Sequence, residues 1–415
     1  MKLSRRQFGG VLGAGLLYPY MGGFVKPGSR SFRIRTITAG VRLDDPTRLG
    51  EVETALGFLQ RARSRFEAQE YEVQTLRIAT QPLARYLPDW SSRPAIEAIE
   101  ALDRLAAAEG VVCSIGPVIT DDRHDESFAA WAAELVGSTS VISFSASVAS
   151  AAGGVHRQTV RAAAEAMTAI AAGTEGGGGN FRFAATAFCP PGTPFFPAAF
   201  FTQGESFSIG LESPRLIQEA FEGTDDLEEA KRRLGSLMED SLRPVEELAR
   251  ELAGETGWSY MGIDVSPAPG LDASIGRAIE SLTGEPFGAA STLTACAAVT
   301  DVLKGLEVQQ CGYSGLMLPV LEDTVLARRA MEGRYGVSDL LLYSSVCGTG
   351  LDVVPLPGDT TSDALGRLVG DVASLAAKYG KPLSARLFPV PGKAVGETVH
   401  FDNPHLTDAV VMELP

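Results

Sequence analysis

From Phe32 onward, short runs of β-forming residues alternate with longer stretches in which apolar residues recur every three or four positions. This alternation is typical of α/β proteins with a largely parallel sheet, because a helix returns the chain between each pair of parallel strands. Ten candidate strands follow from it, at residues 32–38, 72–79, 111–115, 140–145, 181–187, 206–211, 258–265, 351–356, 383–388 and 397–401. Ten strands are too many for a small doubly wound domain, so the pattern predicts one large α/β unit.

The chain offers no clear boundary between two folded domains. Neither a long Pro- or Ser-rich linker nor a fixed-period repeat interrupts the alternation. We therefore predict that residues 1–30 are a leader and lead-in and that residues 31–415 form a single α/β domain. Two helices are well marked: one starts after Asp225 as N-cap and stops at Gly254, and the other spans residues 362–379.

One low-complexity patch, residues 173–180, is rich in glycine and lies between a predicted helix and a predicted strand. We interpret it as a flexible connection. It lacks the Lys and Ser/Thr of a phosphate-binding loop, and no helix follows it. The chain also has no His-Glu-x-x-His, Gly-x-Ser-x-Gly or dinucleotide-binding motif. We therefore expect no bound nucleotide, and the usual metalloprotease and α/β-hydrolase motifs are missing.

The first 24 residues pair two consecutive arginines with a weakly apolar, glycine-rich run. Ser4, Arg5, Arg6 and Phe8 precede residues 9–24. This arrangement resembles a twin-arginine export signal, which implies the twin-arginine translocation machinery as a partner and a periplasmic or extracellular location. The alternative is an ordinary basic N-terminus before a lead-in segment.

Acidic residues outnumber basic ones by 51 to 36, so the net charge is -15. Such a surface repels phosphate backbones and anionic lipid headgroups, which argues against nucleic-acid binding. Small cations, metals and basic or neutral solutes remain open as ligands, and a homo-oligomer is compatible with the composition.

No run approaches the roughly 18 apolar residues of a membrane-spanning helix. The five cysteines include no Cys-x-x-Cys pair, so common zinc-ribbon and thioredoxin spacings are excluded.

Several blocks of the C-terminal half, read together, resemble the bacterial and archaeal family known as domain of unknown function 711. The strongest blocks are residues 262–269, 311–323 and 347–357. Weaker matches occur at residues 33–40, 193–196, 204–205 and 391–393. The order and spacing of these blocks carry the resemblance, which extends over nearly the whole chain after the leader.

The resemblance implies a ten-stranded α/β barrel similar to that of glycyl-radical enzymes such as pyruvate formate-lyase. It does not imply their chemistry. Those enzymes need a glycine in an Arg-Val-x-Gly-Tyr loop near the C-terminus, and the nearest counterpart here, residues 333–336, has neither that order nor that place. We therefore expect no glycyl radical. The leader and the Pro-rich residues 189–194 depart from the usual family pattern.

Three carboxylates are placed where strands of an α/β barrel end. Asp264 follows a predicted strand, and Glu322 and Asp323 follow an apolar run and open a helix. Catalytic groups of barrels collect at such ends, so one hypothesis is that the three bind a divalent metal or a basic solute. The alternatives are an Asx-turn for Asp264 and N-terminal helix acids for Glu322 and Asp323.

Cys347, Asp352 and His156 are further candidates for catalysis. Cys347 precedes a Gly-Thr-Gly turn where backbone amides favour a thiolate, although a buried inert thiol is the alternative. Asp352, one step into the next strand, either orients a neighbour or bonds a turn amide. His156 follows two glycines at a helix start, as an anion-binding or a capping residue. Ser266, Ser314, Glu205 and Lys393 lie in the family-like blocks and are expected to contact a ligand.

Two functions follow from these features. The first is an exported enzyme that acts on a small polar substrate through a carboxylate-rich barrel site with a divalent metal as cofactor. The second is a non-catalytic protein that binds or senses a solute outside the membrane, because histidine is scarce and the sequence shows no complete pair of nucleophile and base. The sequence does not decide between them.

Overall fold

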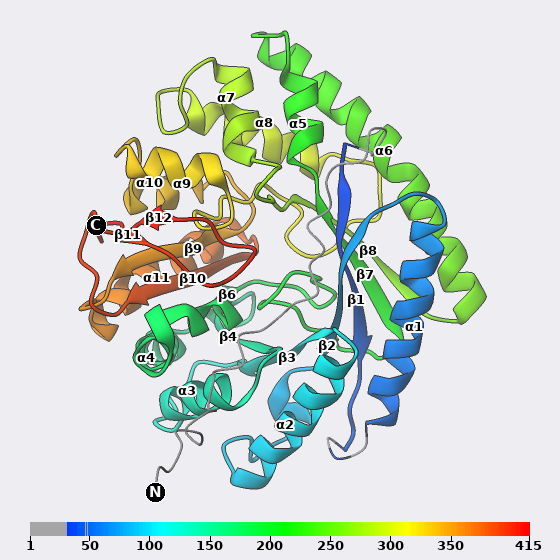
Figure 1. The fold of residues 1–415 in the computed structure, drawn as a ribbon, viewed down its shortest axis with the longest axis vertical. Helices are drawn as coiled ribbons and strands as arrows, with labels where there is room; N and C mark the ends of the chain where they lie inside the picture. The colour runs from blue at the N-terminus through cyan, green and yellow to red at the C-terminus, as the bar shows by residue number, and fades with distance from the viewer. Residues whose placement is uncertain (1–30, 46, 48) are drawn as a thin grey trace, which may run out of the picture.

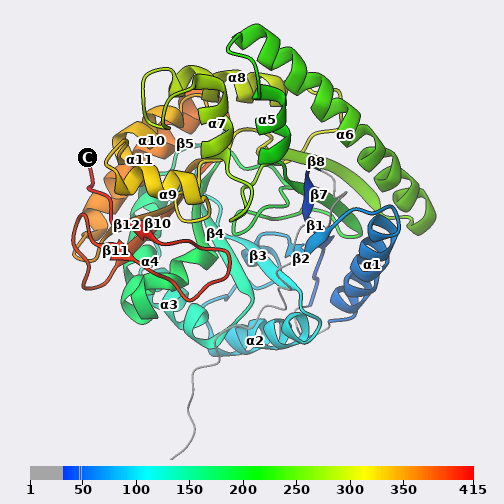
Figure 2. The ribbon, with the colours of Figure 1, turned by 45° about the horizontal axis from the view of Figure 1, so that its top comes forward.

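The computed structural model describes residues 31–415 except 46 and 48. The predicted export-signal residues Ser4, Arg5, Arg6 and Phe8 lie outside the described residues. Within the described part, the chain is a mixed α/β protein whose strands lie at the centre and whose helices surround them (Figures 1 and 2). No helix in this part is long and apolar enough to cross a membrane.

The first half of the chain forms five neighbouring parallel strands. Their order in the sheet follows their order in the sequence. They are β1 (Arg33–Val41), β2 (Val73–Thr80), β3 (Val112–Ile119), β4 (Ile142–Ser150) and β6 (Phe183–Ala187). The short strand β5 (Gly154–Val155) pairs with the end of β4.

The second half of the chain adds a pair of strands to each edge of the sheet that the first half forms. Next to β1 lies β7 (Ser206–Glu212), antiparallel to it, followed by β8 (Ser259–Pro267). Next to β6 lies β10 (Leu383–Val390), also antiparallel, followed by β9 (Gly350–Pro357). Each added pair is parallel within itself. The result is a ten-stranded, mostly parallel sheet.

One extended segment contacts both outer strands of this sheet. Gln310 makes a parallel bridge to Ile263 of β8, and Pro319 makes a parallel bridge to Asp352 of β9. Backbone hydrogen bonds support both bridges: Cys311 donates to Ile263, and Val320 donates to Asp352. Residues 310–320 therefore connect β8 and β9, the two outermost strands of the sheet.

Helices pack on the outside of the strands (Figure 2). Their apolar faces supply the core, as in α6, where buried leucine and valine side chains recur at helical spacing while charged residues face outward. α1 (Gly50–Glu67) packs on β1 and β2, α6 (Leu227–Thr256) on β8, and α11 (Ser362–Tyr379) on β10. The remaining helices are α2 (Arg93–Ala108), α3 (Phe128–Ser138), α4 (Arg157–Gly173), α5 (Pro214–Phe221), α7 (Ile275–Thr283), α8 (Thr292–Lys304), α9 (Thr324–Met331), α10 (Val337–Tyr343), and the 3-10 helices η1 (Leu83–Arg85) and η2 (Glu175–Arg182).

Nine of the ten candidate strands belong to the sheet, and the tenth prediction is wrong. Residues 397–401 contribute only β11 (Thr398–Val399), which pairs with β12 (Ala409–Val410) in a separate two-stranded sheet. The turn-forming sequence Asp402-Asn403-Pro404 ends the strand there. The N-cap of α6 is Asp226 and its C-cap is Gly257, so the boundaries predicted at Asp225 and Gly254 are also wrong.

The glycine-rich patch is not a loose connection but the 3-10 helix η2. Gly176 and Gly177 have φ values of 57° and 72°, which residues with a Cβ rarely adopt. A Cβ at Gly177 would overlap the carbonyl oxygen of Pro389 in β10. Glycine is therefore required because the backbone of η2 packs directly against β10.

Candidate functional site

An interior cavity of about 110 Å³ lies among the strands. Its wall includes side chains from β1, β2, β4, β9 and β10, together with residues 195–198 and residues from 313 to 322. A cavity of about 150 Å³ accommodates benzene in another protein, so this space of about 110 Å³ is suited to a small molecule. Strands that are far apart in the sheet order thus contribute to one site.

The cavity wall carries more positive than negative side chains. Two carboxylates, Glu322 and Asp352, belong to the wall. Four guanidinium groups belong to it, those of Arg35, Arg77, Arg182 and Arg386. Arg182 donates to the backbone carbonyl oxygens of Val136 and Ile142 and to the hydroxyl of Thr139. The formal charge of the lining is therefore positive, although the whole chain is strongly acidic.

Arg386 joins both carboxylates of the wall. Its Nε lies 2.6 Å from Asp352 Oδ1, and its Nη2 lies 2.8 Å from Glu322 Oε1. Burial opposes the charge of Arg386, but the two carboxylates outweigh it and raise the pKa of the guanidinium. Burial raises the pKa of Asp352, with Glu322 adding to the effect and Arg386 opposing it. The three side chains form a buried ion-pair cluster.

The cluster extends across the cavity to β1. Glu322 Oε2 lies 3.7 Å from Arg35 Nη2, and Arg35 Nη1 lies 3.5 Å from Glu212 of β7. Glu212 also contacts Arg33, which shares a face of β1 with Arg35 because the two are separated by one residue. A continuous set of buried charges therefore runs from β9 and β10 on one side to β1 and β7 on the other.

Two further polar side chains, His405 and Ser143, belong to the wall. Burial lowers the pKa of His405 to about 3, and the positive charges of Arg35 and Arg77 add to the effect. The imidazole is therefore neutral at physiological pH. Ser143 of β4 is 5% exposed, and its hydroxyl has no hydrogen-bond partner among the described residues. Ser143 is thus a lining residue whose hydroxyl lacks a partner among the described residues.

Part of the apolar wall comes from the chain between β6 and β7. Phe195 and Phe196 line the cavity, and the guanidinium of Arg77 lies 5.0 Å from the centre of the Phe196 ring. Strand hydroxyls fix this segment by donating to its carbonyl oxygens: Thr38 to Pro194, Ser208 to Gly192 and Ser114 to Ala199. The segment is held by the strands that surround it.

Asp264 is fully buried and binds the chain rather than the cavity. Its carboxylate accepts hydrogen bonds from the backbone amides of Ser266, Tyr313 and Ser314 and from the hydroxyl of Ser266. Burial raises its pKa, and these bonds act in the opposite direction. The Asx-turn interpretation matches this geometry, and the residue also fixes Tyr313, whose ring lines the cavity.

Asp323 is likewise buried as a helix cap. Its carboxylate accepts from the amides of Val325 and Leu326 in α9 and from Ile275 and Gly276 in α7. Only Glu322, of the three carboxylates expected to share a metal, lines the cavity. Within the described residues, no group of three or more His, Cys, Asp or Glu side chains is placed to bind a metal ion.

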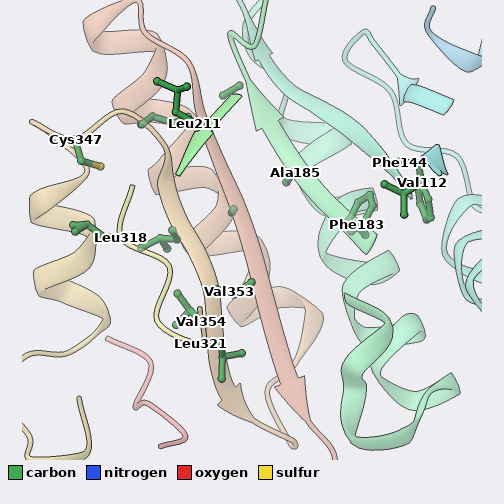
Figure 3. Packing of buried hydrophobic residues seen from close by; sticks show 14 of the residues in the cluster. Val112, Phe144, Phe183, Ala185, Leu211, Leu318, Leu321, Cys347, Val353 and Val354 are labelled. Atoms are coloured by element: carbon green, nitrogen blue, oxygen red, sulfur yellow. The ribbon is translucent and has the colours of Figure 1, made fainter. Parts of the chain in front are cut away.

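Cys347 and His156 also lie outside the cavity wall. Cys347 is buried in the hydrophobic core, in the cluster that also contains Leu318 and Val353 (Figure 3). His156 precedes α4, where its Nδ1 lies 2.8 Å from the Ser147 carbonyl and its Nε2 lies 3.0 Å from Ser150 Oγ. His156 therefore ties the start of α4 to β4. Asp352, in contrast, is part of the cavity as described above.

The four predicted ligand contacts do not line the cavity. Ser266 donates to Asp264 and accepts from the amide of Gly315, and Ser314 donates to the Cys311 carbonyl. Glu205 is exposed in the turn before β7. Lys393 forms an ion pair with Glu397 at 3.7 Å. Ser266 and Ser314 support the site indirectly through Asp264.

The sequence reasoning missed the arginines that dominate the cavity. Arg35, Arg77 and Arg386 each lie within a predicted strand, in β1, β2 and β10. A charged residue within a buried strand is costly unless it is paired, and this was the available signal. Ser143 carries no comparable signal, because a serine in a strand is unremarkable.

The chain is similar to proteins of bacteria and archaea over most of its length. A family model described as "Uncharacterised ACR (DUF711)" matches residues 28–403. A UPF0210 protein of Desulforudis audaxviator is 30% identical over 403 residues, covering 89% of this chain and 88% of the relative. A UPF0210 protein of Pyrobaculum islandicum is 31% identical over 345 residues, covering 79% and 75%. One of Neisseria meningitidis serogroup C is 25% identical over 398 residues, covering 90% and 88%.

Proposed function

This chain belongs to the family described as Uncharacterised ACR (DUF711), and we propose that it binds a small organic anion in the interior cavity. The observation that carries the proposal is the charge of the wall, where four guanidinium groups accompany two carboxylates. Guanidinium groups offer paired N–H donors that match a carboxylate. Phe195, Phe196 and Met317 offer contacts to an apolar body of the ligand.

We propose an anionic ligand, whereas the acidic composition of the chain favoured cations and basic or neutral solutes. The acidic residues that give the net charge of -15 lie mostly on the exposed surface, whereas the wall is set by buried arginines. The neutral state of His405 supports the same conclusion, since nearby positive charge disfavours its protonation. A small monocarboxylate with an apolar body is the class of ligand that fits both the charge and the size of the cavity.

Thermal-shift measurements with matched ligands test this proposal. Benzoate and butyrate should raise the melting temperature, because binding to the folded state stabilises it by mass action. Benzamide and benzylammonium, which have the same shape without the negative charge, should have little effect. Equal stabilisation by all four compounds, or by none of them, would contradict binding of an organic anion.

Ser143 and Ser145 provide a matched pair of variants for the cavity. Both are buried in β4 and both have a hydroxyl without a partner among the described residues, but only Ser143 lines the cavity. Ser143→Ala should weaken benzoate binding by roughly tenfold through loss of one charge-assisted hydrogen bond, with stability unchanged. Ser145→Ala should bind as the wild type does. Equal weakening in both variants would place the ligand elsewhere.

A second candidate function is acid–base catalysis on the bound anion. Asp352 favours it, since this buried carboxyl lies in the cavity wall and its pKa is raised by burial. Bound butyrate should then exchange the hydrogens on the carbon next to its carboxylate for deuterium in D₂O, as followed by NMR. Asp352→Asn should slow the exchange by about 100-fold or more. Absence of exchange with every bound carboxylate would favour the binding function alone.

We also propose that the nine strands from β8 to β9 and residues 310–320, as the tenth strand, close into a barrel like that of glycyl-radical enzymes, with β5 outside it. Two observations support closure: the parallel bridges from this segment to β8 and β9, and the approach of Arg35 and Arg386 to the same carboxylate. In hydrogen exchange, the amides of Ile263, Cys311 and Val320 should be as protected as those within β8 and β9. Rapid exchange at all three would indicate an open sheet.

The leader supports a further proposal, export by the twin-arginine route. It rests on Ser4, Arg5, Arg6 and Phe8, which lie outside the described residues. Cell fractionation of the wild type and the Arg5→Lys, Arg6→Lys double variant tests it, because loss of both arginines should retain the protein in the cytoplasm. Equal export of both, or retention of both, would overturn the proposal.

A further inference from the structure

A second cavity, of about 280 Å³, lies behind the wall of the first. We call it the lysine cavity, and its lining includes Thr300, Lys304, Cys347, Gly348 and Lys381. One layer of residues, which we call the partition, separates the interior cavity from the lysine cavity. Tyr313 and Thr349 face the interior cavity, whereas Cys347 and Gly348 face the lysine cavity.

Backbone carbonyl groups position the two ammonium groups of this cavity. Lys304 Nζ lies 2.7 Å from the Tyr313 carbonyl oxygen, and Lys381 Nζ lies 2.8 Å and 2.7 Å from those of Ser345 and Cys347. An ammonium group has three N–H donors. These bonds therefore leave two donors on Lys304 and one on Lys381.

Neither ammonium group has a carboxylate partner. Over the described part of the chain, no Asp or Glu oxygen lies within 4.0 Å of Lys304 Nζ or Lys381 Nζ. Asp301 also lines the cavity, but its carboxylate is 70% exposed and lies 3.9 Å from Lys231. Burial lowers the pKa of both lysines; the charge of Asp264 opposes this effect at Lys304, and the charge of Lys304 adds to it at Lys381. Neither ammonium group is therefore in direct contact with a carboxylate among the described residues.

A hydroxyl group adds an independent observation. Thr300 Oγ1 is buried and has no hydrogen-bond partner among the described residues, although Thr300 lines the cavity. With the three remaining N–H donors, the cavity offers four donors and two positive charges. Tetrahedral oxyanions present several acceptor oxygens and more than one negative charge, and lysine is a common phosphate ligand.

We propose that the lysine cavity binds a phosphate group between Lys304 and Lys381, with Thr300 as an additional donor. The position of both lysines at the ends of α8 and α11 explains part of their presence, because helix C-termini favour cations. It does not explain a cavity between two ammonium groups without a carboxylate. The phosphate supplies the missing counter-charge.

Isothermal titration calorimetry with inorganic phosphate tests the proposal. The wild type should bind with a dissociation constant of about 1 mM or tighter. Lys304→Met and Lys381→Met should each weaken binding by about tenfold or more, since each removes a charge-assisted contact. Lys378→Met, at an exposed lysine in the last turn of α11, should bind as the wild type does.

Thr300→Val keeps the test valid if a lysine variant fails to fold. Its hydroxyl has no partner within the described part of the chain, so the change should leave stability intact and weaken phosphate binding several-fold. Absence of phosphate binding by the wild type, or unchanged affinity in Lys304→Met and Thr300→Val, would overturn the proposal.

Phenyl phosphate in the same titration distinguishes a phosphate ester from free phosphate. Binding at least as tight as that of inorganic phosphate identifies an ester as the ligand, whereas weaker binding identifies the free ion. Ser143→Ala, which tests the interior cavity, should leave phosphate binding unchanged. The two sites can therefore fail independently.

Discussion

At the scale of single residues, Arg386 is the side chain on which the interior cavity most depends. It is 7% exposed and pairs with two buried carboxylates. Arg386→Met should lower the free energy of unfolding by about 3–5 kcal/mol, because Asp352 would lose its ion-pair partner and Glu322 would keep only Arg35, 3.7 Å away. Urea denaturation measures this loss. Arg93→Met, which breaks an exposed ion pair with Glu97, is the control and should have little effect.

The triple variant Arg386→Met, Glu322→Gln, Asp352→Asn separates loss of the ion pairs from loss of packing. Removing all three charges together should restore most of the lost stability, because a buried ion pair offsets its own desolvation only approximately. If the triple variant were as unstable as Arg386→Met, the loss would come from packing. Both outcomes are read from the same denaturation curves.

His405 should give the protein a measurable dependence on pH. Its pKa in the folded state is about 3, compared with 6.5 for the free side chain, because of burial and the charges of Arg35 and Arg77. Between these values the unfolded chain binds a proton that the folded chain does not, so stability falls as the pH decreases from 6.5. The expected slope is at most about 1.4 kcal/mol per pH unit.

Urea denaturation between about pH 5 and pH 7 measures this slope. His405→Gln should flatten it, because the variant lacks the proton-binding group. His400→Gln changes an exposed histidine and should follow the wild type. An identical slope for the wild type and His405→Gln would show that the imidazole is not held in its neutral form.

At the scale of elements, the partition between the two cavities depends on two glycines. Gly315 and Gly348 come from segments 33 positions apart in the sequence and contact each other backbone to backbone. A Cβ at Gly315 would lie 2.6 Å from Gly348 Cα, and one at Gly348 would overlap the Gly315 backbone. Gly348→Ala should therefore destabilise the fold by about 1–3 kcal/mol or more.

The control for this prediction is Gly57→Ala in α1. A Cβ at Gly57 meets no atom within 4 Å, and alanine is favoured over glycine inside a helix. This variant should gain about 0.5–1 kcal/mol of stability. Thermal or urea denaturation of both variants gives the comparison. If Gly348→Ala were as stable as Gly57→Ala, the close contact would not constrain the partition.

The strands and several helix boundaries were predictable because their signals are local. Alternating apolar runs located β1 and β10, and the glycine after α11 marked its end. The site was less predictable, because its residues come together only through the curvature of the sheet. Asp264 and Asp323 looked like ligands in sequence, but the chain uses their carboxylates to hold turns and helix starts. Arg35 and Arg386 contact one carboxylate although they are separated by 351 positions.

At the scale of the whole molecule, the acidic surface and the basic cavity act on an anionic ligand in opposite directions. The net charge of -15 repels the ligand during approach, and salt screens this repulsion over a Debye length of about 10 Å at 0.1 M. The association rate of fluorobenzoate, measured by ¹⁹F NMR exchange, should therefore rise between about 20 mM and about 200 mM salt. A falling rate would mean that the cavity charge dominates at long range.

The two antiparallel junctions of the sheet determine when the chain can fold during synthesis. β1 and β6 form the edges of the first five strands, and their outer partners β7 and β10 begin only at Ser206 and Leu383. Until those residues leave the ribosome, the nascent half exposes two unpaired strand edges, which favour aggregation. A ribosome-bound chain ending near residue 200 should thus need a chaperone to stay soluble.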